Sequence, residues 1–212
     1  MAVSAEASVY SGSAPVHDSV TLVPGSFKRL LRSTEEAVRI GLLLSWNLVW
    51  MKPTYAELRS TMALASDIGV NRIRILRLML NGRAWTNRSQ LELDMEMMRR
   101  SAEVFQTLSL LFPRVTLAYS KPLAFQLAGK DDCQPSCGAG LGQLVVQADG
   151  VVLPCVGMRT KPPFSIGDVR KETLEQILAR SEGNAFTSLS RRFHECPAVI
   201  YRQEPALVQI SV

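Results

Sequence analysis

Apolar residues in the first 128 positions follow two patterns that alternate along the chain. Nearly continuous apolar runs, typical of strands buried in a parallel sheet, lie at 42–50, 72–80 and 114–120. Apolar residues at steps of three and four, which predict amphipathic helices, lie at 24–41, 54–69 and 89–105. Strands that alternate with such helices form right-handed βαβ units, so we expect a parallel sheet covered by helices.

Residues that can cap helices stand at the expected starts of these helices. Ser26 precedes the first apolar-periodic segment and is the predicted N-cap. Thr54 with Glu57, and Ser89 with Glu92, have the spacing of capping boxes. These pairs predict where the second and third helices begin.

The composition changes near residue 128, after which glycine, proline and cysteine become frequent. An Asp-Gly pair at 149–150, between two short apolar runs, predicts a hairpin with a two-residue type I′ turn. Pairing Ala148 with Val151 then sets Leu144 opposite Cys155.

Residues 171–180 predict one helix in this region, with Leu174, Ile177 and Leu178 on one face. We therefore expect two domains, at 1–128 and 129–202, followed by a short tail at 203–212.

Composition and charge limit the class of protein. No apolar run reaches the roughly 18 residues of a membrane span, and no basic segment followed by an apolar one occurs at the N-terminus. We therefore expect a cytoplasmic protein, not associated with a membrane, with reduced thiols. The net charge is +5, but Arg99-Arg100 and Arg191-Arg192 are isolated pairs, which argues against a nucleic-acid-binding stripe.

All the cysteines lie in the last eighty residues, at Cys133, Cys137, Cys155 and Cys196. Spacing alone leaves three interpretations: a [4Fe–4S] cluster, a tetrahedral zinc site, and four buried thiols without a metal. The absence of a C-x2-C knuckle argues against zinc, whereas glycines beside Cys137 allow backbone N–H groups to approach inorganic sulfides. His194, close to Cys196, is a further candidate metal ligand.

The glycine-rich segment at 138–142 has a superficial likeness to a dinucleotide-binding loop. It follows no predicted strand and begins no predicted helix, which excludes that interpretation.

Three segments of the second region carry a resemblance to a known family: CGAGLGQLVVQADGVVLPC at 137–155, FSIGDVRKETLEQIL at 164–178 and FHECPA at 193–198. They resemble the SPASM or twitch-type C-terminal domain of radical SAM maturases. The resemblance implies that Cys133, Cys137, Cys155 and Cys196 hold one auxiliary [4Fe–4S] cluster, and the cysteines for a second cluster are absent. Asp168 stands where the family often has asparagine, a mild departure.

The first region resembles the barrel of the same enzymes. Segments 17–31, 46–70 and 74–88 look like the stretch after strand four, strand five with its helix, and strand six with its loop. The expected fold is thus α/β: a partial βα (TIM-like) barrel of parallel strands, followed by a small cysteine-rich α+β domain.

Four polar residues match positions near the S-adenosylmethionine pocket of the family: Ser8, Asn47, Arg74 and Arg77. Polar residues at such positions are more often structural hydrogen-bonding residues. The periodicity of the strand does not decide between the two arginines.

Radical SAM chemistry requires a C-x3-C-x2-C loop, and no cysteine precedes Cys133. The chain is therefore expected to bind S-adenosylmethionine only when a missing N-terminal half is supplied, and not to cleave it alone. The resemblance implies a peptide or protein substrate. The alternative is a non-catalytic iron–sulfur or zinc-binding partner protein.

A sheet that begins with the strand near Ser8–Tyr10 would have an unpaired edge and an apolar interior face. We therefore expect the chain to self-associate or to bind a partner chain.

Overall fold

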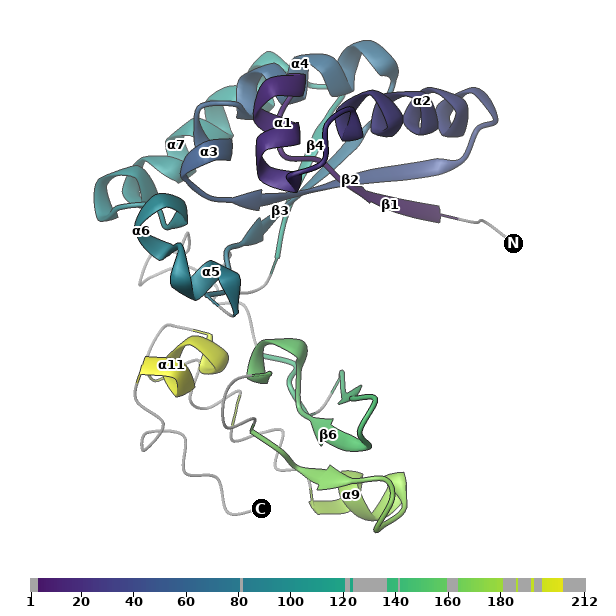
Figure 1. Ribbon diagram of the computed structural model, residues 1–212, viewed down its shortest axis with the longest axis vertical. Helices are drawn as coiled ribbons and strands as arrows, with labels where there is room; N and C mark the ends of the chain where they lie inside the picture. Colours follow the sequence, from purple (N-terminus) through teal and green to yellow (C-terminus); the bar gives the residue numbers. More distant parts are fainter. Residues whose placement is uncertain are drawn as a thin grey trace. The chain divides into compact units, whose positions relative to one another are not determined.

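The chain forms two compact units, Met1–Leu123 and Ala124–Val212 (Figure 1). The computed structural model describes residues 4–80, 82–120, 123, 137–140, 142–159, 164–180, 186, 192 and 196–203.

The first unit is built on a parallel sheet with helices along one face, as predicted (Figure 1). The strands, in their spatial order, are β1 (Ser4–Ser8), β2 (Leu43–Trp50), β3 (Arg72–Arg77) and β4 (Thr116–Tyr119). The helices on that face are α1 (Ala14–Thr21), α2 (Ser26–Arg39), α3 (Lys52–Tyr55), α4 (Leu58–Ile68) and α7 (Met95–Leu111). Two short helices, α5 (Arg83–Thr86) and α6 (Arg88–Leu91), follow β3.

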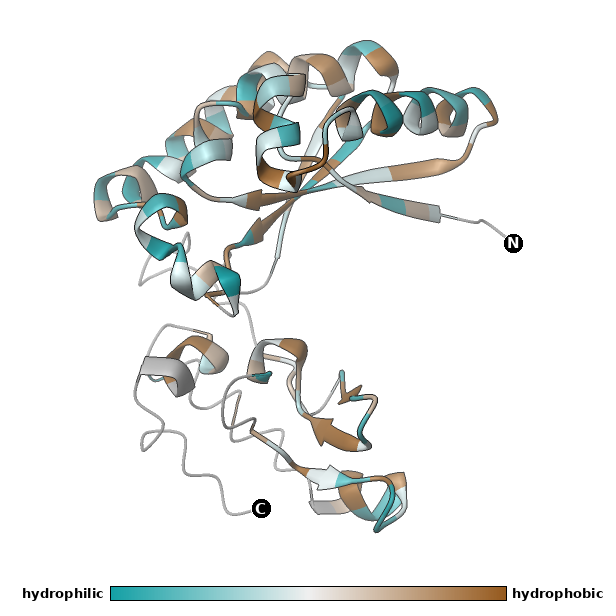
Figure 2. Cartoon of the chain, viewed as in Figure 1, coloured by the Kyte–Doolittle hydropathy of each residue, from teal (hydrophilic) through white to brown (hydrophobic). Residues whose placement is uncertain are grey.

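The core of the first unit lies between the sheet and these helices. Its largest fully buried strand residues are Trp46, Leu48, Trp50, Ile73 and Ile75. Both indole N–H groups have partners, because Trp46 Nε1 donates to Thr34 Oγ1 at 3.2 Å and Trp50 Nε1 donates to Ser101 Oγ at 2.8 Å. Figure 2 shows the helices with hydrophobic and hydrophilic residues on different sides, as amphipathic helices require.

The opposite face of the sheet is polar, so the prediction of an apolar interior face is wrong. Ser8, Asn47 and Arg74 are neighbours in register across three strands, and Glu6 and Arg72 are exposed at alternate positions on the same face. The reason is that β1 and β3 alternate apolar and polar residues rather than being apolar throughout. Within the described strands, β1 pairs only with β2, so it forms an edge of the sheet as predicted.

The predicted capping residues are wrong for all three helices. The carboxylate of Asp18 takes the role assigned to Ser26, since it accepts hydrogen bonds from the Gly25 and Phe27 N–H groups and from Ser26 Oγ. Thr54 lies inside α3 and Ser89 inside α6. The cap of α7 is Asp94, whose Oδ1 accepts from the Met97 N–H group at 2.7 Å.

The second unit contains a small antiparallel sheet and short helices. The strands lie in the order β5 (Val145–Val146), β6 (Val151–Leu153) and β7 (Gly167–Asp168). The helices are the 3-10 turn η1 (Val156–Met158), α9 (Leu174–Arg180) and α11 (Pro197–Gln203). Of the three apolar residues on the predicted face of this helix, Ile177 is fully buried, while Leu174 and Leu178 are each 44% exposed.

The hairpin forms where it is predicted, but its register differs by one residue. Val145 pairs with Leu153, and the Gly150 N–H group donates to Gln147 C=O at 2.9 Å. In the turn only Gly150 has a positive φ, of 85°, because Asp149 does not adopt the left-handed conformation that a type I′ turn requires. The loop therefore has three residues, and the predicted pairing of Leu144 with Cys155 is wrong.

None of the described helices combines the length and apolar character that a membrane span needs.

Candidate metal centre

Three cysteines of the second unit come from separate segments that backbone contacts hold close to one another. Cys137 begins the glycine-rich loop, and the N–H group of Gly140 in this loop donates to Pro154 C=O at 3.1 Å. Pro154 directly precedes Cys155, which lies two residues after the end of β6. Helix α11, which directly follows Cys196, contacts the η1 turn that follows Cys155. Backbone contacts thus gather three sulfur-bearing segments at one end of the hairpin.

The thiol of Cys196 is buried and lies near the other two described cysteines. Burial raises the pKa of its thiol to about 11, and the nearby Cys155 and Cys137 act in the same direction. Hydrogen bonds from the N–H groups of Ala198 and Val199, at the start of α11, act in the opposite direction by favouring the thiolate. The sulfur of Cys196 is therefore buried, close to two other sulfurs and served by backbone donors.

The burial of these sulfurs and the hydrogen-bond donors near them indicate whether a metal group fits. Cys155 and Cys196 are buried and Cys137 is half-buried. Among the residues that the structure describes, no three His, Cys, Asp or Glu side chains are arranged to hold a single metal ion. Buried sulfurs with N–H donors suit a thiolate-bound cluster, in which each cysteine binds a different iron.

Two of the predicted metal ligands, Cys133 and the candidate His194, lie outside the described residues.

The predicted cofactor residues lie on the polar face of the first sheet, where Asn47 and Arg74 share one partner. Asn47 Nδ2 donates to Glu6 Oε2 at 2.9 Å, and Arg74 Nη1 lies 3.2 Å from Glu6 Oε1. We refer to Glu6, Asn47 and Arg74 as the polar row. Asn47 Oδ1 is buried and has no hydrogen-bond partner within the described part of the chain.

The structure separates the two arginines that the sequence left undecided. Arg74 is in register with Asn47, whereas Arg77 is in register with Trp50, whose side chain belongs to the helix-covered core. Ser8 is the register neighbour of Asn47 at the end of β1. The sequence analysis missed Glu6, although its position two residues before Ser8 places it on the same face.

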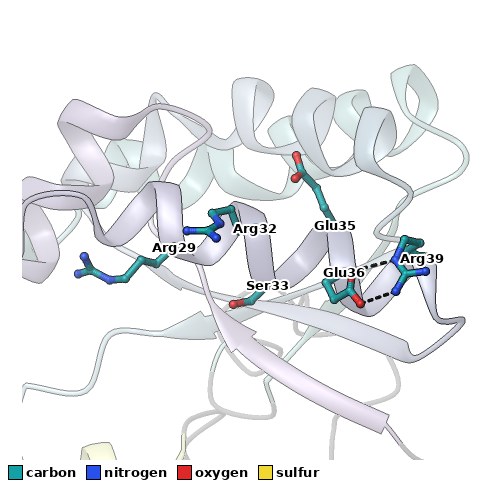
Figure 3. Close-up of a pocket in the computed structure, with 6 residues that line it drawn as sticks. All are labelled: Arg29, Arg32, Ser33, Glu35, Glu36 and Arg39. Atoms are coloured by element: carbon teal, nitrogen blue, oxygen red, sulfur yellow. Dashed lines mark hydrogen bonds and ion pairs between the residues drawn. The ribbon is translucent and has the colours of Figure 1, made fainter.

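A separate hollow lies along α2, lined by Arg29, Arg32, Ser33, Glu35, Glu36 and Arg39 (Figure 3). The Arg39 Nε donates to Glu36 Oε2 at 2.8 Å, and both side chains are exposed. Among the described residues that line it, none belongs to the polar row or to the cysteine group.

Comparisons with known proteins agree with this arrangement. Residues 137–198 match the SPASM family, described as an iron-sulfur cluster-binding domain. No curated protein matches the chain.

The fold of the chain is similar to solved structures of Streptococcus suis SuiB. SuiB bound to the precursor peptide SuiA aligns with a TM-score of 0.62 and 13% identity, covering 82% of this chain and 41% of that one. SuiB bound to S-adenosylmethionine aligns with a TM-score of 0.58 and 12% identity, with 82% and 41% covered. A further crystal structure of SuiB gives a TM-score of 0.60 and 13% identity, with 82% of this chain and 42% of that one covered, so the chain spans less than half the length of SuiB.

The family match confirms the SPASM part of the resemblance, over residues 137–198, and the likeness to SuiB confirms the fold that the resemblance implies.

Proposed function

We propose that this chain is the C-terminal portion of a radical SAM/SPASM-type iron–sulfur maturase whose second unit binds one auxiliary [4Fe–4S] cluster. The SPASM match over residues 137–198 carries the proposal, because the three described cysteines of that segment converge in the fold. Cys133, Cys137, Cys155 and Cys196 are the proposed ligands.

A cluster is favoured over zinc by the arrangement of the cysteines. Structural zinc sites commonly present a C-x2-C knuckle, and the sequence contains none. A four-iron cluster needs one cysteine at each iron and therefore a wider spread of sulfurs.

The chain's own residues support a bound thiolate in three ways. The Ala198 and Val199 N–H groups favour the charged form of Cys196, burial excludes water from Cys155 and Cys196, and the Gly140 hydrogen bond fixes the loop after Cys137. When bound, an auxiliary cluster with a cysteine at every iron supplies electron relay. Because metal binding needs deprotonated cysteines, loading of the site releases protons.

The polar row is the proposed contact for S-adenosylmethionine when the missing N-terminal half of the barrel is supplied. The Asn47 Oδ1 acceptor has no partner among the described residues, and such a buried acceptor favours a ligand that donates a hydrogen bond. The Arg74 guanidinium suits a carboxylate. Ser8, beside Asn47 in register, completes this set, whereas Arg77 is in register with the core residue Trp50 and lies apart from the polar row.

The proposed substrate is a peptide or protein, which the alignment with SuiB bound to its precursor peptide supports. The edge of β1, which pairs only with β2 among the described strands, is open to a further strand. A non-catalytic iron–sulfur partner protein remains the second candidate, supported by the same SPASM match and by the lack of a C-x3-C-x2-C motif in the sequence.

The test is anaerobic purification followed by iron, sulfide and zinc analysis. We expect about four irons and four sulfides per chain, with broad absorbance at about 400 nm that bleaches on reduction. Cys155→Ala should abolish this absorbance, whereas the matched control Val156→Ala, at an adjacent residue that is 67% exposed, should retain it. Stoichiometric zinc without sulfide would overturn the assignment.

The two candidate functions differ in what happens to S-adenosylmethionine. Under dithionite, the chain alone should form no 5′-deoxyadenosine, because its four cysteines all belong to the proposed auxiliary site. Cleavage by the chain alone would contradict both candidates. Cleavage that requires both this chain and a polypeptide carrying C-x3-C-x2-C would favour the maturase over the non-catalytic partner.

A further inference from the structure

The two short helices α5 and α6 occupy the position at which binding loops occur in βα folds. They follow β3 directly, and the loops after the carboxyl ends of parallel strands hold the binding and catalytic residues in such folds. Lys52 Nζ, from the first residue of α3 after β2, donates to Ser89 C=O in α6 at 2.8 Å. This bond joins the segments that follow two neighbouring strands.

Trp85 in α5 differs from the other two tryptophans of the chain. Its side chain is 54% exposed, while Trp46 and Trp50 are 0% and 1% exposed. The guanidinium carbon of Arg88 lies 4.7 Å from the centre of the Trp85 ring, a cation–π contact. Asn87 Nδ2 donates to Arg83 C=O at 2.9 Å and fixes the junction of the two helices. An exposed aromatic side chain is thus held in a fixed position. The binding of a partner therefore costs this surface little conformational entropy.

The charge of this surface indicates the kind of partner. Residues 82–91 contain Arg83 and Arg88 and no acidic residue. Within the described residues, no carboxylate forms an ion pair with either arginine. Tryptophan and arginine are the side chains most enriched at the energetic centres of protein interfaces. A chain with apolar and acidic residues complements both features, whereas a nucleic acid would need a longer basic track.

We propose that Trp85, Arg83 and Arg88 form a docking surface for an acidic and apolar segment of the peptide substrate. The inference depends on the proposed function in that the partner is a peptide, and it adds where on the chain that peptide is held and by which chemistry.

The three tryptophans allow a direct test on the full chain. Iodide should quench only the fluorescence of Trp85, and Trp85→Phe should remove the quenchable fraction. A synthetic peptide rich in Asp, Glu and Leu should protect Trp85 from iodide, and the same peptide with Lys in place of the acids should not. Arg88→Gln should weaken protection about tenfold. Arg32→Gln, the same change of charge on α2, is the matched control and should leave it unchanged.

Equal protection by the acidic and the basic peptide, or no protection by either, would overturn the proposal. Protection by a single-stranded oligonucleotide but not by the acidic peptide would overturn it in favour of nucleic-acid binding. The iron and sulfide content of the same preparation is measured separately, so a failure of the docking surface is distinguishable from a failure of the cluster assignment.

Discussion

The strands of the first unit have four to eight residues, whereas those of the second unit have two or three. In the first unit, Trp46, Trp50 and Phe105 are fully buried between a sheet and several helices. The second unit buries Leu153, Met158 and Phe186, with fewer backbone pairs around them. Small domains with little regular structure commonly gain stability from a bound metal. We therefore expect burial to account for most of the stability of the first unit, and the second unit to depend on the proposed cluster.

Removal of the proposed cluster should have the largest effect on this difference. Chelation under anaerobic conditions should unfold the second unit, because its hairpin and α11 are joined around the cysteines. The first unit should remain folded. Amide hydrogen exchange would follow both at once, with protection lost at β6 and retained at β2 and β3. Equal loss of protection in the two units would show that they do not differ in this way.

A substitution in the core of the first unit should destabilise that unit and leave the second unit unchanged. Trp50→Ala leaves a large cavity beside Phe105, whose ring centre lies 4.8 Å from that of Trp50, and deprives Ser101 of a hydrogen bond. We expect a loss of about 3–5 kcal/mol in the free energy of unfolding of the first unit. The iron content of the second unit should not change.

Trp85→Ala is the control for this core substitution, since it removes the same side chain from an exposed position. It should alter the free energy of unfolding by less than about 1 kcal/mol. Denaturant unfolding monitored by circular dichroism measures both values, and similar losses for the two variants would contradict the assigned core.

The elements of the first unit could be predicted because their signals are local and repeated. The run at 42–50 and the periodic segment at 24–41 each combine many residues that agree, and both elements form almost where predicted. The polar row was partly predictable, since Asn47 and Arg74 stood out as polar residues in strands. Its partner Glu6 was not identified, because a contact between residues 6 and 74 depends on strand register.

The helix caps and the register of the hairpin could not be predicted, because each depends on the hydrogen bonds or backbone conformation of one or two residues. Asp18 caps α2 from seven residues before Gly25, a geometry that a spacing rule for capping boxes does not include. The capping box of α9, in contrast, follows the rule but was not recognised: Gln176 N–H donates to Thr173 Oγ1, and Thr173 N–H donates to Gln176 Oε1. In the hairpin, the φ angle of Asp149 alone decides between a two-residue and a three-residue loop.

A glycine in the second unit provides a smaller test of its packing. A Cβ atom at Gly167 would lie 2.6 Å from Ile177 Cγ1, so Gly167→Ala should push α9 away from β7. We expect a loss of about 1–3 kcal/mol, confined to the second unit and accompanied by lower iron occupancy. Gly142→Ala is the matched control, because the heavy atom nearest to its Cβ would be Gly138 O, 3.9 Å away. Iron analysis and thermal unfolding compare the two variants, and equal effects would contradict the contact between β7 and α9.

Mild acid should produce the smallest effect, in the first unit. His17 is buried, and its Nδ1 accepts a hydrogen bond from the Tyr10 N–H group at 3.3 Å. Burial lowers the pKa of His17 below its ordinary value of 6.5, an effect that the neighbouring Asp18 partly offsets. The folded state therefore holds the neutral ring, while the unfolded chain takes up a proton as the pH falls below about 6.5.

The stability that the neutral His17 ring provides is complete above its ordinary pKa and is lost as the pH falls from there toward the lowered value in the folded protein. The urea midpoint of the first unit should thus decrease between about pH 7 and pH 5. His17→Gln keeps an acceptor for Tyr10 without titrating, so its midpoint should change less over the same range. An equal decrease of the urea midpoint in the wild type and in this variant would show that groups other than His17 cause the acid sensitivity of the first unit.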